Sequence, residues 1–350
     1  MKKWIAIIIA AALVISLASC KSAGQKTVDG DNSTQGSADS SQPAAEPSPG
    51  TAEPSQPATD GETNPTVSGS AAPTPVETSQ IPPDAFAFTL KNMPVIDGST
   101  ATIPLIEAVY SVLLGIPRDD AARMVNISGT DNAYDNLIWG NADILLVYAP
   151  SPAVAENAKS NNVSLEMAPI GRDGLVFLVN IANPVESLTP QQIVSIYSGE
   201  TLNWKNVGGE DAQIKAFQRP YRSGSQTMMD ELVMKGAPMA EAEPEFVIGE
   251  MGGLIEAVAQ FDNAQSAIGY NVYYFVSQME INENVRMLAV DGVVPSTQSI
   301  SDGSYPFISD FYAVIRADTP EDSPARILYN WIQSADGQNL VTHEGYATAG

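Results

Sequence analysis

The distribution of apolar residues divides the 350-residue chain into three stretches. Residues 4–18 form an uncharged apolar run that follows Lys2 and Lys3. This run is shorter than the about 20 apolar residues that a membrane-spanning helix needs, and its basic start is typical of a secretory leader. Ser, Thr, Pro, Gly, Ala, Asp and Glu dominate residues 21–83, whereas short apolar runs alternate with helical patterns from about residue 85 onward. The pattern therefore predicts a leader, a polar stalk and a folded region.

The end of the leader carries a motif that is similar to a bacterial lipobox, Leu17-Ala18-Ser19-Cys20. Cys20 is the only cysteine in the sequence, and an odd cysteine in a secreted chain needs a reason. Stable lipid anchoring takes more than one hydrocarbon chain, such as a diacylglyceryl group together with palmitate. We predict a signal peptide over residues 1–19 and a lipoprotein anchored through Cys20 to the extracytoplasmic face of the cell membrane. The alternative is an ordinary leader that is cleaved nearby, with an incidental cysteine.

The polar stretch offers almost nothing to bury. Such a segment does not offset its conformational entropy, and its prolines stiffen it locally. We therefore expect residues 20–84 to be a disordered stalk that carries the folded region away from the lipid surface; partner binding by this stretch is the alternative.

The folded region, residues 85–350, has the length of a two-lobed protein. Its apolar pattern predicts strands at Met93–Ile96, Asp143–Tyr148, Leu175–Val179, Ala267–Tyr270 and Phe311–Ile315. It predicts helices at Pro104–Leu114, Asn132–Trp139, Thr189–Tyr197, Gln226–Lys235, Gly253–Ala259 and Ser323–Ser334. Strands that alternate with helices indicate an α/β fold with largely parallel sheets, in which ligands bind at the carboxyl ends of strands.

Charge and composition exclude several classes of function. The net charge of the chain is −24, and the loss of Lys2 and Lys3 with the leader would make it −26. A chain this acidic is a poor candidate for binding nucleic acid. His343 is the only histidine, so we expect no zinc site, no cofactor and no Ser-His-Asp or Cys-His catalysis.

Two polar turns stand directly before predicted helices. Gly98-Ser99-Thr100 follows the first strand and precedes a helix with Pro104 in its first turn. Ser223-Gly224-Ser225 precedes another helix, with Arg219 and Arg222 close by. Free N–H groups and the helix dipole make such a turn an anion site, and arginine adds a planar fork of donors. The alternative is that these residues only cap their helices.

A third place combines Ser128-Gly129-Thr130 with Asp143, which opens an apolar strand. A carboxylate in that position must find donors or become protonated. Beside a bound oxyanion it accepts a hydrogen bond from a protonated ligand oxygen and repels a fully deprotonated one. The alternative is that Asp143 caps a neighbouring turn.

The chain from about Pro94 to Gly350 resembles the phosphate-binding periplasmic proteins of ABC importers, and most closely the lipoprotein members found in Gram-positive bacteria. The motifs that carry this resemblance occur in the family's order: Asn183-Pro184-Val185-Glu186-Ser187-Leu188-Thr189, Gln192-Ile193-Val194, Ile196-Tyr197-Ser198-Gly199, Asn203-Trp204, Gly208-Gly209, Ala267-Ile268-Gly269-Tyr270, Trp331, Ala335-Asp336-Gly337-Gln338 and Gly345-Tyr346.

The resemblance implies a type II periplasmic-binding-protein fold, a Venus flytrap of two α/β lobes with the ligand in the cleft. The first lobe would hold about 85–175 and 270–350, and the second about 176–269. The family's ligand groups map onto Gly98, Ser99, Thr100, Thr130, Asp143, Arg219, Ser223, Gly224 and Ser225. The chain departs from the family at three places. Arg222 has no counterpart, and Ser225 replaces a threonine. The second ligand loop, which begins with Ser128-Gly129-Thr130, lacks the family's glycine-rich run and reads Thr130-Asp131-Asn132-Ala133-Tyr134, in which Asp131 adds an acid.

The sequence thus predicts a monomeric, non-enzymatic lipoprotein that captures phosphate or a similar oxyanion and delivers it to an ABC permease. The alternative is a sensor, adhesin or surface module of the same fold with another ligand or a vestigial pocket. A hydrolase is disfavoured because the sequence contains no Gly-x-Ser-x-Gly elbow and no carboxylate pair with a recognisable acid/base spacing.

Overall fold

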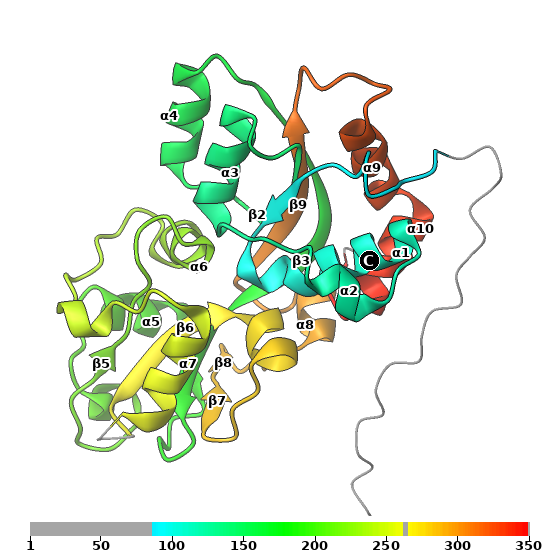
Figure 1. Ribbon diagram of the computed structural model, residues 1–350. Coiled ribbons are helices and arrows are strands. Elements are labelled where there is room, and N and C mark those ends of the chain that lie inside the picture. The colour runs from blue at the N-terminus through cyan, green and yellow to red at the C-terminus, as the bar shows by residue number, and fades with distance from the viewer. Residues whose placement is uncertain (1–85, 262–264, 349–350) are drawn as a thin grey trace, which may run out of the picture. The chain divides into compact units, whose positions relative to one another are not determined.

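The structure, a computed structural model, describes residues 86–261 and 265–348 (Figure 1). All of these residues belong to one compact unit with the limits Thr74–Gly350. The predicted signal peptide (1–19), the lipidation site Cys20 and the predicted stalk (20–84) lie outside the described residues. Within the described part of the chain, none of the helices combines the length and the apolar character required to span a membrane.

Strands and helices alternate along the chain, with several short elements between them. The strands are β1 (Ile96–Gly98), β2 (Ile144–Tyr148), β3 (Leu165–Asn180), β4 (Ser187–Leu188), β5 (Lys215–Ala216), β6 (Ala267–Val272), β7 (Val285–Met287), β8 (Ala289–Val290) and β9 (Ile308–Arg316). The α-helices are α1 (Ile103–Leu114), α2 (Arg118–Ala122), α3 (Thr130–Trp139), α4 (Pro152–Ser160), α5 (Pro190–Tyr197), α6 (Gly224–Met228), α7 (Met251–Gln260), α8 (Thr297–Ser301), α9 (Pro324–Gln333) and α10 (Ala335–His343). Short 3-10 segments are η1 (Thr100–Thr102), η2 (Trp204–Val207) and η4 (Pro244–Phe246), and π-helical segments are η3 (Met229–Met234) and η5 (Phe275–Met279).

One long strand connects the two parts of the main sheet. The strand order is β1-β2-β9-β3-β6-β5, with β7 paired to β3, and β4 and β8 form a separate pair. Residues 165–174 of β3 pair with β9, whereas residues 175–180 pair with β6 and β7. We call β1, β2, β9 and the start of β3 the first sheet part, and the end of β3 with β5, β6 and β7 the second sheet part.

The expectation of largely parallel sheets is wrong. The pairs β1–β2, β5–β6 and β4–β8 are parallel, but β9 runs antiparallel to β2 and β3, and β3 runs antiparallel to β6 and β7. The alternation of strands and helices indicates parallel neighbours only where a helix returns the chain to the same edge. The partners of β3 lie more than a hundred residues away in β9 and β7, and local periodicity carries no information about the direction in which such strands meet.

Both faces of β2 are covered, which explains its uninterrupted apolar run. Successive side chains of a strand point to opposite faces. Leu145 and Val147 pack with residues of α3 and α4 in one core, whereas Ile144 and Leu146 join the larger core that includes α1. In Figure 1, α3 and α4 accordingly lie on one side of the first sheet part and α1, α9 and α10 on the other.

The predicted helices are found at their places with shifts of a few residues, and the ends of α1 show why. Pro104 occupies the first turn of α1, where its missing N–H is not needed, and the helix stops at Gly115, whose φ of 64° is left-handed. The apolar pattern missed the helices α2, α4, α8 and α10, the short strands β4, β5, β7 and β8, and the start of β3. Residues 165–174 of β3 include a proline and three charged side chains, so they do not show the alternation that identifies a half-buried strand.

A buried carboxylate lies where the pairing of β3 changes from β9 to β6. Asp173 accepts hydrogen bonds from the Gly174 N–H (2.7 Å), the Tyr274 N–H (3.0 Å) and the Tyr148 hydroxyl (2.5 Å). Burial is the largest influence on this group and raises the pKa of Asp173 from 3.8 to about 6, although the three hydrogen bonds act in the opposite direction. The fold therefore holds a proton at Asp173 over a range of pH in which the unfolded chain has released it.

This raised pKa predicts a loss of stability with rising pH that Asp173→Asn removes. Because the folded pKa lies above the unfolded value, the contribution of Asp173 is fully present below about pH 4 and is lost as the pH rises through about 6. We expect the free energy of unfolding of the wild type to fall relative to Asp173→Asn by on the order of 2 kcal/mol between about pH 4 and pH 7.5. Denaturant titrations at both pH values measure this difference. The exposed carboxylate of Asp119 provides the control Asp119→Asn, and parallel pH profiles for the wild type and Asp173→Asn would contradict the assignment.

Candidate functional site

A cavity of about 490 Å³ lies at the carboxyl ends of strands from both sheet parts. Ser99 follows β1, Tyr148 ends β2, Arg219 follows β5 and Val272 ends β6. Ligands of open α/β sheets bind at such ends, because the turns between strands and helices meet there. The other lining residues are Thr100, Ala101, Ile127, Ser128, Gly129, Thr130, Asn132, Pro220, Tyr221, Arg222, Ser223, Gly224, Ser225, Gly249, Glu250 and Met251.

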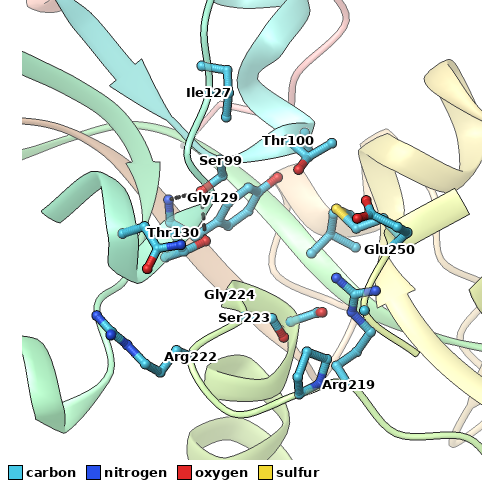
Figure 2. A pocket seen from close by; sticks show the side chains of 18 of the residues that line it. Ser99, Thr100, Ile127, Gly129, Thr130, Arg219, Arg222, Ser223, Gly224 and Glu250 are labelled. Atoms are coloured by element: carbon cyan, nitrogen blue, oxygen red, sulfur yellow. Dashed lines mark hydrogen bonds between the residues drawn. The ribbon is translucent and has the colours of Figure 1, made fainter. Parts of the chain in front are cut away.

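Four helical segments begin at this cavity. Their N-caps are Ser99 for η1, which continues into α1, Gly129 for α3, Ser223 for α6, which continues into η3, and Glu250 for α7. The first N–H groups of a helix have no intrahelical acceptor, and the helix dipole makes this end positive. Gly129 has a φ of 85°, which a residue with a side chain rarely adopts. Figure 2 labels the four N-cap residues Ser99, Gly129, Ser223 and Glu250 around the cavity. The cavity is thus bordered by helix starts whose main-chain N–H groups suit a negative charge.

The hydroxyl groups of Ser99, before η1, and Thr130, at the start of α3, lie beside these donors. Ser99 Oγ and Thr130 Oγ1 are 2.9 Å apart, and Ser99 Oγ accepts a hydrogen bond from the Tyr148 N–H at 3.2 Å. Thr102 donates its hydroxyl proton toward the carbonyl oxygens of Ser99 and Leu146, at 2.8 and 2.7 Å. These bonds fix the turn after β1 against β2, so that Ser99 and Thr130 remain in hydrogen-bonding distance on one wall of the cavity.

Arg219 supplies a buried positive charge without a carboxylate partner. The residue is 6% exposed, and Nη1 donates to the Ile248 carbonyl oxygen at 3.0 Å. Among the described residues, no acceptor is found for its Nε atom, and no carboxylate lies within ion-pair distance of its guanidinium. Burial lowers the pKa of Arg219, an effect that Tyr270 and Glu250 partly oppose. A desolvated guanidinium at the wall of a cavity is poised to bind an anion.

The main chain of Arg219 is fixed by hydrogen bonds to residues of β6 and α6. Its N–H donates to the Tyr270 hydroxyl oxygen at 3.0 Å, and the Tyr270 hydroxyl in turn donates to Gln226 Oε1. Tyr270 belongs to β6 and Gln226 to α6. The segment that carries Arg219 is therefore tied to the strand and the helix on either side of it.

The second arginine of this segment has a different role. Arg222 forms ion pairs with Asp131 (Nε to Oδ2, 3.4 Å) and with Asp135, and both acids belong to α3. The Asp131 carboxylate also accepts hydrogen bonds from the Ser151 N–H and hydroxyl. Asp131 is buried and does not line the cavity. Its negative charge is balanced by the ion pair with Arg222.

Among the described residues that line the cavity, Glu250 alone is acidic. It is exposed at the mouth of the cavity, as the N-cap of α7. Figure 2 shows Glu250 on the same side as Arg219, opposite the Ser99 and Thr130 wall. A carboxylate at this position attracts the Arg219 guanidinium from a distance without neutralising it.

Seven of the residues predicted from the sequence line this one cavity: Ser99, Thr100, Thr130, Arg219, Ser223, Gly224 and Ser225. Gly98 does not, because it is buried in β1, where an added Cβ would lie 2.1 Å from the Leu146 carbonyl oxygen. Its role is the close approach of β1 to β2.

The placement of Asp143 at the ligand is corrected by the structure. Asp143 stands before β2, whereas the cavity lies at the other end of that strand, at Tyr148. Five residues of a strand span roughly 16 Å. The exposed Asp143 carboxylate accepts the Val95 N–H at 2.8 Å and thereby ties the start of β2 to the segment before β1. The turn-capping alternative is therefore the one that the structure supports.

Sequence reasoning missed Tyr148, Glu250 and Val272 as lining residues. Glu250 precedes a helix that begins with two glycines after Met251, and this position has the same form as the other N-caps. Tyr148 and Val272 end their strands without any polar signal. The described residues contain no group of three or more His, Cys, Asp or Glu side chains placed to hold a metal ion.

Comparisons with known proteins agree with this geometry. A family model described as a PBP superfamily domain matches residues 89–335. The Phosphate-binding protein PstS of Bacillus subtilis (strain 168) is 24% identical over 253 residues, which are 72% of this chain and 79% of that protein. Its name describes a binding protein and not an enzyme.

Two solved structures show the same fold. A Clostridium perfringens protein described as a phosphate ABC transporter substrate-binding protein, with bound phosphate, is similar with a TM-score of 0.55 and 24% identity, covering 74% of this chain and 100% of that chain. An ABC-type phosphate transport receptor from Vibrio cholerae is similar with a TM-score of 0.54 and 22% identity, covering 72% and 98% of the two chains. The predicted α/β fold with two lobes is confirmed by these similarities.

The tight contact between Gly224 and Thr130 predicts that Gly224→Ala destabilises the protein. A Cβ at Gly224 would lie 2.5 Å from Thr130 Oγ1, and overpacking of this kind costs about 1–3 kcal/mol. Thermal or denaturant unfolding measures the loss. Gly252→Ala is the matched control near the start of α7, because its Cβ would meet only the Glu280 side chain at 3.7 Å or more. Equal effects of the two substitutions would contradict the proposed contact.

Proposed function

The chain belongs to the PBP superfamily, whose domain spans residues 89–335, and on this basis we propose that it captures phosphate or a similar oxyanion for an ABC importer. The cavity between the two lobes is the binding site. Ser99, Thr100 and Thr130 bind the anion from one side, and Arg219 with the Ser223-Gly224-Ser225 turn binds it from the other. The protein acts by binding and release, without chemical conversion of the ligand.

The observation that carries this proposal is the unpaired guanidinium of Arg219. A buried charge that lacks a partner is penalised by several kcal/mol. A bound oxyanion compensates that charge, while helix N-termini and hydroxyls saturate its remaining oxygens. Arg222 does not compete for this role, because Asp131 and Asp135 already engage its guanidinium.

The acidic residue that the sequence adds to the second loop does not oppose anion binding in this arrangement. An ion pair between Arg219 and Asp131 that filled the cavity would favour the alternative of a vestigial pocket. Asp131 instead pairs with Arg222 and is buried, and about 490 Å³ remains beside Arg219. The geometry therefore favours a functional binding protein over a sensor or adhesin with a lost site. The names of the relatives support phosphate as the ligand.

The lobe boundaries are part of the proposal. The first lobe comprises about 85–175 and 270–350, and the second about 176–269. The change of partner along β3 near residues 174–175 supports the first boundary. The second boundary falls within β6, and beyond it β7 pairs with the end of β3 and β8 pairs with β4. These pairings favour a second boundary after β8, at about residue 290. We also propose that the protein is a monomer.

The anchor is proposed from the sequence: a signal peptide over 1–19, lipid with palmitate on Cys20, a stalk over 20–84 and an extracytoplasmic position on the cell membrane. We expect Cys20→Ser to move the protein from the membrane fraction to the soluble fraction, because Cys20 is the only cysteine available for lipidation. Fractionation and labelling with a radioactive fatty acid check this. Membrane-bound, labelled Cys20→Ser protein would refute the lipoprotein assignment.

Arg219→Gln is expected to weaken phosphate binding about 10- to 100-fold, since a hydrogen bond to a charged group contributes about 1.5–3 kcal/mol. Titration calorimetry of the purified chain with phosphate measures this. Arg123→Gln is the charge-matched control, because Arg123 is exposed directly after α2 and, among the described residues, forms an ion pair with Asp120 alone. The ligand-free Arg219→Gln protein should unfold at an unchanged or higher denaturant concentration, because no ion pair is lost.

Absence of heat and of any thermal shift for the wild type with excess phosphate would overturn the proposed function. Full affinity of Arg219→Gln would leave phosphate binding intact but remove Arg219 from the site.

A further inference from the structure

Arg222 joins the two lobes through ion pairs with two acids, Asp131 and Asp135, neither of which is among the proposed anion ligands. Its guanidinium reaches Asp131 and Asp135 on α3, which packs on β1, β2 and β9 of the first sheet part. Arg222 itself precedes α6, which packs on β6 of the second sheet part. Figure 2 shows the Arg222 side chain directed away from Arg219 and toward the Thr130 side of the cavity. The two arginines of this loop therefore point in different directions: Arg219 lies at the cavity wall, and Arg222 reaches toward α3.

The acids of this ion pair are more deeply buried than the arginine. The Asp131 side chain is 0% exposed and the Asp135 side chain 10%, compared with 39% for Arg222. Asp131 accepts hydrogen bonds from Ser151, and Asp135 accepts one from Asn157 at 2.5 Å. Two carboxylates one helical turn apart repel each other, and among the described residues Arg222 is the cation that pairs with both. Separation of the lobes would leave these two buried acids without their counter-charge.

The main chain around Arg222 is shaped for this contact. Arg222 has a φ of 75°, a left-handed conformation that is unfavourable for a residue with a side chain. The next residue, Ser223, caps α6 by accepting the Gln226 N–H at 3.3 Å. Gly224 then approaches Thr130 so closely that a Cβ would meet Thr130 Oγ1 at 2.5 Å. The strained residue therefore lies immediately before the point where the helix starts of the two lobes meet.

We propose that Arg222 is a positioning residue: its ion pairs with Asp131 and Asp135 hold the start of α6 against the start of α3, so that the anion donors of both lobes are assembled before the ligand enters. Arg222 increases ligand affinity without touching the ligand. Asp131 and Arg222, two of the positions at which this sequence departs from the family, thus compensate each other.

The proposal and a direct contact between Arg222 and the anion predict opposite effects of Asp135→Asn on phosphate affinity. Arg222→Gln removes the ion pairs; if the assembled fraction falls to about a tenth, phosphate affinity falls about tenfold. Asp135→Asn weakens the same link and should also lower the affinity, while the double variant binds no more weakly than Arg222→Gln alone. Arg222→Lys should restore part of the loss. If Arg222 bound the anion directly, Asp135→Asn would free its guanidinium and raise the affinity, and that result would overturn the proposal.

Titration calorimetry with inorganic phosphate provides these affinities. The controls are Arg123→Gln and Asp120→Asn, which remove an exposed ion pair between α2 and its C-cap residue that does not join the lobes. Both should leave phosphate affinity unchanged. Asp135→Asn keeps an acceptor for Asn157, and it therefore tests the link even if Arg222→Gln folds poorly.

A distance measurement tests the assembly without any ligand. Cys20→Ser removes the only cysteine, so spin labels can be placed at Lys159→Cys on α4 and Glu200→Cys after α5, both exposed positions on different lobes. In phosphate-free buffer, double electron–electron resonance should give a longer distance between the two spin labels in Arg222→Gln than in the same labelled protein with Arg222 intact. Equal distances would overturn the proposal. This readout is independent of the proposed function, which fails only if the wild type does not bind phosphate.

Discussion

The guanidinium of Arg219 is buried beside a cavity and has no carboxylate partner among the described residues. Maintaining such a group requires that every nearby acid be occupied elsewhere or held at a distance. Asp131 and Asp135 satisfy this requirement because Arg222 and polar groups of Ser151 and Asn157 bind them. Glu250 satisfies it by lying exposed at the mouth of the cavity. The arrangement of charges around the cavity therefore leaves the Arg219 guanidinium without a neutralising carboxylate among the described residues.

The sheet sets the distance between the two halves of this site. β3 passes from the first sheet part to the second, and Asp173 marks the change of partner by binding the main chain after β6 and the hydroxyl of Tyr148. Tyr148 ends β2 and lines the cavity, and its N–H binds Ser99. A single run of hydrogen bonds thus connects the change of partner along β3 with Ser99, the residue that follows β1 and lines the cavity. Asp173 titrates at this junction and is not among the residues that line the cavity.

The residues that line the cavity were predictable from the sequence where the signal was local. Ser99, Thr130 and Ser223 stand at the starts of helices, and hydroxyls with glycine beside them mark such starts. Asp143 was misplaced because an acid next to an apolar strand reveals nothing about which end of the sheet holds the ligand. The direction of β3 and β9 was not predictable either. Their pairing, like the pairing of Arg222 with Asp135 across 87 positions, depends on contacts between distant segments that no periodicity encodes.

Four helix starts surround the cavity, and the donors at each of them belong to the main chain. Every residue except proline carries that N–H group, so substitutions at these positions change the side chain while the donor stays in place. A site built in this way tolerates sequence divergence better than one built from specialised side chains. The common fold of this chain and proteins with 22–24% identity is consistent with that tolerance. Searches that score only residue identity at contact positions would therefore undercount binding proteins of this type, whereas the geometry of helix starts around one buried arginine would identify them.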